Sequence, residues 1–136
     1  MSSYPTLREL SVTAGAVFIG PWQDIDHEKF IVVAGVDGHK ALVCCVLINS
    51  AINPFIRRRP KMMACQLEIK ESDYGFLSHK SYINCAQPVT ASFRHFLGDE
   101  YRYCGLLTNK DLIAVQKLII ASGVMTDDEL GRFFKS

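Results

Sequence analysis

The sequence of 136 residues lacks the features of several common classes of protein. No apolar run reaches the ~18 residues that cross a bilayer, and the N-terminus has no basic-then-apolar signal pattern. No glycines are arranged as a phosphate-cradling loop after a strand, which disfavours nucleotide-binding folds. Lys plus Arg number 15 and Asp plus Glu 14. This balance excludes a nucleic-acid binder that works by bulk charge, although not one with a local basic patch.

Five cysteines are present, but none is spaced as a CxxC pair and the number is odd. Most of them lie in apolar, strand-like runs. We therefore expect neither structural zinc nor a disulfide framework, and a reducing cytosol is favoured. The length fits a single domain, because domains typically have ~100–150 residues. Together these features predict a soluble, cytoplasmic, single-domain protein with no membrane segment.

Three segments carry the signal of a helix start, a threonine followed three residues later by an acidic residue. The pairs are Thr6 and Glu9, Thr108 and Asp111, and Thr126 and Glu129. After the second pair, apolar residues recur at helical intervals until Gly123 ends the run. The sequence therefore predicts a short N-terminal helix, a longer helix over about 111–121 and a last helix over 127–134.

The middle of the chain is typical of short β-strands. The expected strands are 16–19, 30–36, 41–48, 65–69, 81–85 and 89–93. Asp37-Gly38 favours a tight type I′ hairpin turn with positive φ at both residues. Residues 41–48 are apolar throughout, so this strand is expected to lie centrally and to be covered on both faces. Few helices separate the strands, which favours a curled antiparallel sheet in a mainly β fold with C-terminal helices (α+β).

Several polar residues are candidates for chemistry. His27 ends a loop and His79 precedes a strand, and histidine is the usual proton carrier near neutral pH. The alternative is two histidines on solvated turns. The dense positive cluster at Arg57, Arg58 and Arg59 suits a phosphate backbone, or is a charged loop tip. Tyr82 is positioned either to stack on a base or to pack half-buried.

The order of several short motifs resembles that of the PemK/MazF growth-inhibitor toxins. Residues 47–50 (Leu-Ile-Asn-Ser) followed by 53–55 (Asn-Pro-Phe) resemble a family strand that ends in Thr-Ser before a loop. Residues 81–88 resemble the strand that carries the family's Asp-Gln pair, and 106–112 resemble the start of its long C-terminal helix. The resemblance spans roughly residues 15–122.

The resemblance implies a small SH3-like or plasmid-toxin antiparallel barrel, usually dimeric. It implies an endoribonuclease that cleaves single-stranded RNA without a metal or another cofactor, in a toxin–antitoxin or phage-defence system with an antitoxin as possible partner. The ribose 2′-OH attacks the adjacent phosphate, which needs a base, an acid and a cation or donor. By resemblance His27 matches a loop histidine of some members, Asn49-Ser50 matches Thr-Ser, and Gln87 matches the glutamine of Asp-Gln.

The chain also departs from the family pattern. Ala86 replaces the aspartate, Asn84 stands where some members have a catalytic arginine, and Lys29-Phe30 stands where Arg-Pro usually begins a strand. Two readings remain. Either His27, Lys29 and His79 form a variant catalytic site, or the barrel only binds nucleic acid or a partner protein.

The catalytic reading has a geometric requirement. His27 and His79 must converge on one cleft that also holds Ser50 and Asn84, with Lys29 and an arginine near the phosphate. RNA contacts are expected from residues around this cleft, namely Asn49, Arg57, Arg58, Arg59, Tyr82 and Gln87. Residues 1–13 are expected to form an N-terminal extension, 14–107 the barrel and 108–136 the C-terminal helices.

Overall fold

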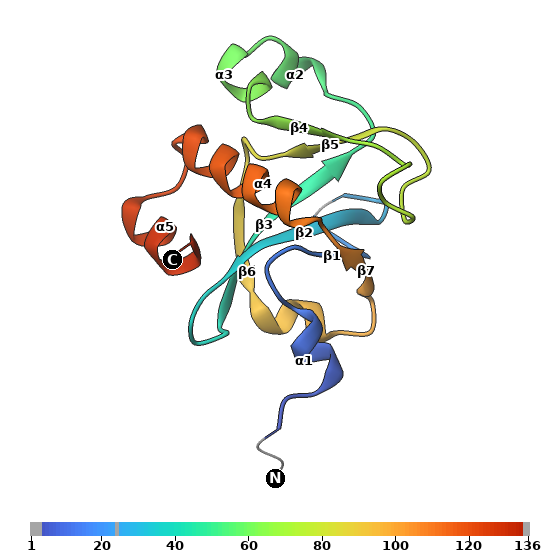
Figure 1. Cartoon of the computed structure of the whole chain (residues 1–136), viewed down its shortest axis with the longest axis vertical. Helices are drawn as coiled ribbons and strands as arrows, with labels where there is room; N and C mark the ends of the chain where they lie inside the picture. Colours follow the sequence, from blue (N-terminus) through green and yellow to red (C-terminus); the bar gives the residue numbers. More distant parts are fainter. Residues whose placement is uncertain (1–3, 24, 135–136) are drawn as a thin grey trace.

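The computed structural model describes residues 4–23 and 25–134 (Figure 1). In this part of the chain seven strands form one antiparallel sheet, in the order β4-β5-β3-β2-β1-β7, with β6 paired to β3. The strands are β1 Ala16–Gly20, β2 Lys29–Val36, β3 Leu42–Asn49, β4 Gln66–Ile69, β5 Ser81–Asn84, β6 Val89–Ser92 and β7 Arg102–Leu106. The helices are α1 Leu7–Ser11, α2 Pro54–Arg57, α3 Pro60–Met63, α4 Asn109–Ser122 and α5 Asp127–Phe134, with a 3-10 segment η1 at Phe93–Leu97. The expected mainly β, α+β architecture is confirmed.

Strand β3 lies at the centre of the sheet, as its apolar sequence predicts. One edge pairs with β2 along most of its length. The other edge is shared, because β6 pairs with Leu42–Cys45 and β5 pairs only with Ile48 and Asn49. Val46 and Leu47 therefore have no strand partner on this edge within the described residues, and the connection 85–88 passes from β5 to β6 beside them.

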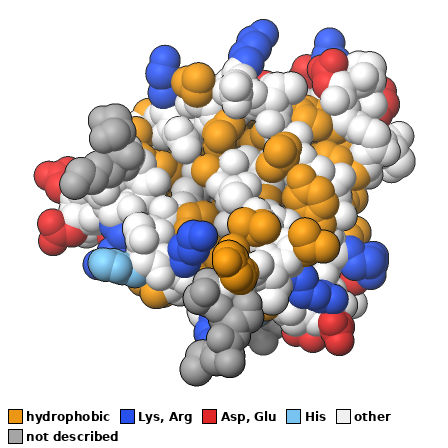
Figure 2. All heavy atoms as spheres, turned by 60° about the horizontal axis from the view of Figure 1, so that its bottom comes forward, with side chains coloured by type: hydrophobic (Ala, Val, Ile, Leu, Met, Phe, Trp, Pro, Cys, Tyr) orange, Lys and Arg blue, Asp and Glu red, His pale blue; other side chains and the backbone are white. Residues whose placement is uncertain are grey.

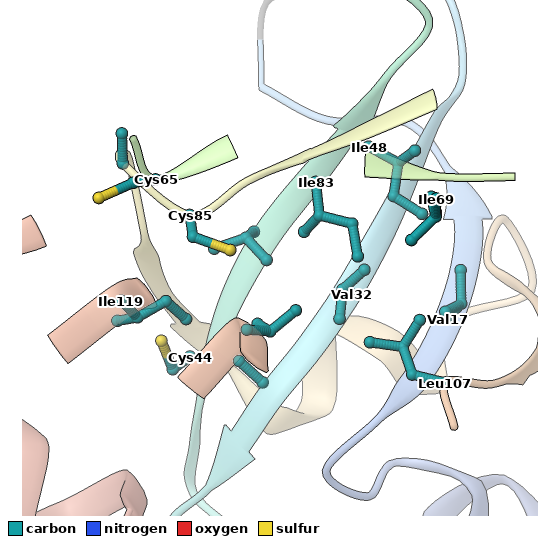
Figure 3. Close-up of a cluster of buried hydrophobic side chains, with 14 of the residues drawn as sticks. Val17, Val32, Cys44, Ile48, Cys65, Ile69, Ile83, Cys85, Leu107 and Ile119 are labelled. Atoms are coloured by element: carbon teal, nitrogen blue, oxygen red, sulfur yellow. The ribbon is translucent and has the colours of Figure 1, made fainter. Parts of the chain in front are cut away.

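The two faces of β3 belong to two separate hydrophobic cores. Cys44, Val46 and Ile48 pack in a core that also holds Val115 and Ile119 of α4. Figure 3 shows Ile119 lying beside Cys44, with Ile48, Ile83 and Val32 further along the same core. The alternate residues of β3 face the second core, which the tryptophan of the β1–β2 loop and the aromatic residues of η1 cover. Burial on both faces follows from the alternation of side chains along a strand.

The three predicted helix starts are confirmed. Thr108 accepts a hydrogen bond from the backbone of Asp111, and the equivalent bonds form at Thr6 and Thr126. Helix α4 ends at Gly123, whose φ of 70° is the left-handed conformation that glycine adopts without strain. These caps satisfy N–H and C=O groups that would otherwise lack partners at the helix ends.

Helix α5 packs closely against β2 at Gly35. A Cβ atom at this position would lie 2.7 Å from the carbonyl oxygen of Phe133. The glycine therefore allows the backbones of helix and strand to approach. Beside it, the Gln116 side chain of α4 donates a 2.9 Å hydrogen bond to the carbonyl of Ala34. Helices α4 and α5 thereby cover one face of the sheet.

Three details differ from the sequence predictions. The β2–β3 turn is not a type I′ turn at Asp37-Gly38, because the residue with positive φ is Lys40, at 53°. The Asp37 side chain accepts a hydrogen bond from Ala41 N and holds this wider turn. No helix was predicted between the strands at 41–48 and 65–69, where α2 and α3 lie, and β7 at Arg102–Leu106 was not predicted. The proposed division at residues 13 and 107 remains a prediction.

Apolar side chains also gather on the surface. Figure 2 shows them on the face that lies at the bottom of Figure 1. Exposed large apolar residues include Leu7 and Leu10 of α1 and Tyr103 and Leu106 of β7. None of the helices in residues 4–23 and 25–134 has the length and apolar character of a bilayer span.

Candidate active site

Both candidate histidines line the same cavity, of ≈190 Å³, together with Lys29 and Ser50. His27 and Lys29 lie where the chain enters β2, Ser50 directly follows β3, and His79 lies in the connection from β4 to β5. Antiparallel pairing brings these strand ends to one end of the sheet. The cavity, called the histidine cleft below, thus collects four residues from three separate segments of the sequence.

His27 is held by its neighbour Asp26. Its Nδ1 lies 3.1 Å from Asp26 Oδ1. This hydrogen bond, and then the charge interaction with His27, lowers the pKa of the Asp26 carboxyl. Because the carboxylate only accepts hydrogen bonds, Nδ1 carries a hydrogen and Nε2 is the nitrogen left for another partner.

His79 has a different partner. Its Nδ1 lies 3.1 Å from the carbonyl oxygen of Lys80, and 3.4 Å from the hydroxyl of Ser81, which itself donates to the His79 carbonyl. A carbonyl oxygen only accepts, so Nδ1 is the donor and Nε2 of the neutral ring is an acceptor.

Lys29 connects the cleft to the neighbouring strand. Its Nζ donates a 2.6 Å hydrogen bond to Asn49 Oδ1 at the end of β3. Partial burial lowers the pKa of Lys29 by disfavouring the charged form. The ammonium is therefore incompletely solvated, which strengthens its attraction to an anion placed beside it.

Asn84 is not brought to the histidine cleft. It is buried at the end of β5, where its Oδ1 accepts hydrogen bonds from Gln66 and from Ala86 N, and its Nδ2 donates to Gln87. It lines a second cavity with Gln87 and Trp22. The geometric requirement is thus met for His27, His79, Lys29 and Ser50, while Asn84 holds the turn after β5.

The arginine cluster is ordered by local contacts. Arg57 Nε donates to the carbonyl of Ile52, and Arg59 donates to that of Phe55 while its guanidinium lies 3.5 Å from the centroid of the Phe55 ring. All three arginines are exposed on α2 and the turn that follows. Arg58 alone of the three has no side-chain partner among the described residues. Tyr82 is half-buried and lies opposite Asn49.

Several residues of the cleft were not predicted from the sequence. Leu77, Phe30 and Ile48 form its apolar wall, and Ser78 and Ser81 add hydroxyl groups. Ser78 and Ser81 are close to His79 in the sequence, and this could have indicated that they belong to the same site. Ile48 and Phe30 were predicted only as strand residues, and their sequence context gave no indication of a site. No group of three His, Cys, Asp or Glu residues in the described part of the chain is placed to hold a metal ion.

Comparison with known proteins gives a fold-level similarity. The structure is similar to that of the Mycobacterium tuberculosis toxin MazF-mt6, with a TM-score of 0.56 and 15% sequence identity, over 82% of this chain and 98% of that chain. No protein-family model and no curated protein matches the sequence. The chain therefore has the fold of a MazF toxin. The expected resemblance to this group is confirmed for the fold.

Proposed function

We propose that the protein is a metal-independent endoribonuclease that cleaves single-stranded RNA. The observation that carries the proposal is the convergence of two histidines, a lysine and a serine on one cavity. The MazF-like fold supports it, because the similar chain is named as a toxin. The reading in which the barrel only binds RNA or a protein is the alternative outcome of the test below.

In the proposed reaction His79 is the general base. Its Nε2 accepts the proton of a ribose 2′-OH, and the 2′ oxygen attacks the adjacent phosphorus. The bond to the 5′ oxygen breaks, and His27, whose Nδ1 is hydrogen-bonded to Asp26, returns a proton to that leaving oxygen. Lys29 and the Ser50 hydroxyl stabilise the additional negative charge on the phosphate oxygens. The products are a 2′,3′-cyclic phosphate and a 5′-hydroxyl.

Residues around the cleft are proposed to hold the RNA. Asn49 and Tyr82 lie opposite each other beside Lys29, so that a base is able to stack on the tyrosine. The arginines of α2 supply phosphate contacts further away. Gln87, which lies at the second cavity, is proposed to contact a base.

The biological setting is also a proposal. By its MazF-like fold, we infer a toxin–antitoxin or phage-defence system with an antitoxin protein as partner. The five cysteines are unpaired thiols, which fits the reducing cytoplasm. A homodimer is proposed because the edge strand β7 exposes Tyr103 and Leu106.

The test is cleavage of single-stranded RNA by the purified protein in EDTA. Wild type is expected to cleave and to leave a 2′,3′-cyclic phosphate. His27→Ala and His79→Ala are each expected to lose about 10²–10⁴-fold in rate, the usual effect of removing one general acid or base. Both side chains are exposed, so the thermal unfolding of the variants should match wild type. His39→Ala, in the β2–β3 turn outside the cleft, is the matched control.

Two results contradict the proposed chemistry. If both histidine variants cleave at the wild-type rate, the cleft is not the catalytic site. If wild type leaves RNA intact in EDTA but shifts it on a gel, the protein is a binder.

A further inference from the structure

The second cavity is a notch in the sheet, and it has a structural cause. It lies beside the two residues of β3 between the segment that pairs with β6 and the segment that pairs with β5. Its volume is ≈170 Å³, and Trp22, Gln23, Leu47, Asn84 and Gln87 are among the residues that line it. Ligand pockets for drug-sized molecules have ~300–1,000 Å³, so this notch suits a single small ring.

A chain of amide side chains fixes the direction in which Gln87 points its groups. Gln66 Nε2 donates to the carbonyl of Met62 and also, at 2.7 Å, to Asn84 Oδ1. Asn84 Nδ2 then donates at 2.8 Å to Gln87 Oε1. Because the Met62 carbonyl only accepts, each amide in the chain has one possible orientation. The side-chain oxygen of Gln87 therefore accepts from Asn84, and its NH₂ group remains as a donor for a ligand.

The backbone of β3 adds a donor and an acceptor. Successive residues of a strand direct their N–H and C=O groups to opposite edges. On the side of β3 that faces β5 and β6, neither Val46 nor Leu47 has a strand partner in the described part of the chain. One of these two residues therefore directs its backbone N–H and its C=O into this gap. The notch thus combines the Gln87 amide donor, a backbone N–H and C=O, and the ring of Trp22.

We propose that the notch is a subsite for one uracil base of the RNA. Uracil presents ring carbonyls beside a ring N–H, so it accepts from the Gln87 NH₂ and pairs with a backbone donor and acceptor. Cytosine and adenine present an amino group and an unprotonated ring nitrogen at the same edge, and their amino group meets the Gln87 donor instead. Guanine also presents a carbonyl beside a ring N–H, but it has an amino group on the other side of that N–H and is larger than the notch favours.

The subsite lies close to the proposed catalytic cleft and rests on the proposed function. Leu47 in the notch and Asn49, which binds Lys29, are two residues apart on β3 and share a face of the sheet. This separation is ~7 Å along the strand. The Ile48 wall of the cleft lies on the other face of β3, so RNA that places a phosphate at Lys29 and a base in the notch would pass around the end of β3 at Asn49.

The test measures binding separately from cleavage. Oligomers U8, C8 and A8 with 2′-fluoro riboses have no attacking hydroxyl, and fluorescence anisotropy gives their affinities. Wild type is expected to bind U8 about tenfold more tightly than C8, the low end of what one good pair of hydrogen bonds to a base edge provides. Gln87→Glu replaces the donor by an acceptor and is expected to invert this preference, because a carboxylate accepts from the cytosine amino group. Gln66→Leu, which releases the amide chain, is expected to reduce the preference without abolishing binding.

Thr90→Glu is the matched control for added charge, since Thr90 is exposed on β6 and does not line the notch. It is expected to weaken U8 and C8 equally. Equal affinities of wild type for U8 and C8 would overturn the subsite while leaving the proposed cleavage intact. An unchanged ratio in Gln87→Glu would overturn the role of Gln87. If wild type binds none of the oligomers, both the subsite and the proposed function are wrong.

Discussion

Replacing Val46 by Asp tests the two-core architecture directly. Val46 is 1% exposed and packs in the core that α4 covers. Removing its burial costs ~1.5–3 kcal/mol. The new carboxyl has no charged partner there, so it takes up a proton; moving its pKa from 3.9 to above 7 costs at least ~4 kcal/mol, at about 1.4 kcal/mol per unit. The sum approaches the whole stability of a small domain, ~5–15 kcal/mol.

The assay is urea unfolding, followed by circular dichroism and by the fluorescence of the single tryptophan, Trp22, which is 4% exposed. The carboxyl in Val46→Asp would have a raised pKa in the folded state, so the folded protein binds more protons than the unfolded chain above about pH 4. The destabilisation is therefore expected to shrink as the pH falls toward 4. Val46→Thr, which buries a hydroxyl, should cost only ~1–3 kcal/mol, and Thr90→Asp on the exposed side of β6 about 0.5 kcal/mol or less. If Val46→Asp unfolded at the wild-type urea concentration, β3 would lie at an exposed edge and the architecture would be wrong.

Two further predictions concern RNA contacts and assembly. Arg58→Gln should leave unfolding unchanged and lower the slope of log affinity for single-stranded RNA against log salt by ~0.7, the share of one phosphate contact; an unchanged slope would remove Arg58 from the interface. Leu106→Lys places a charge on the exposed edge strand, where Leu106 is 55% exposed, so light scattering after gel filtration should show a shift from dimer to monomer. A wild-type monomer, or a variant that remains dimeric, would contradict an interface at β7.

Local signals in the sequence were sufficient for the features that depend on neighbouring residues. A threonine three residues before an acidic residue defines a cap within one turn of helix, which is why all three starts were predictable. The uniform apolar sequence of β3 likewise indicated burial on both faces. The signal for α2 was present too, since Asn53 precedes Pro54 and its side chain caps the helix.

Other features depend on residues that are distant in the sequence. Strand β7 has Arg102 at its start and Gly105 near its end, and neither favours a strand; pairing with β1 supplies its hydrogen bonds. The separation of Asn84 from the histidine cleft follows from amide partners on β4 and in the connection to β6. Spacing along one strand does not contain that information. Whether His27 and His79 line one cavity was likewise left open by the sequence and follows from the pairing of distant strands.

The pairing of β1 with β7 has a consequence for how the chain is made. It joins Ala16–Gly20 to Arg102–Leu106, so the first strand waits until synthesis has passed β7 before both its edges are paired. Chains dominated by such distant contacts also fold more slowly than those with local contacts. While the nascent chain is on the ribosome, the strands up to β6 are available but β1 has one open edge. The complete sheet therefore forms only after β7 has emerged from the ribosome, which delays the appearance of the folded domain.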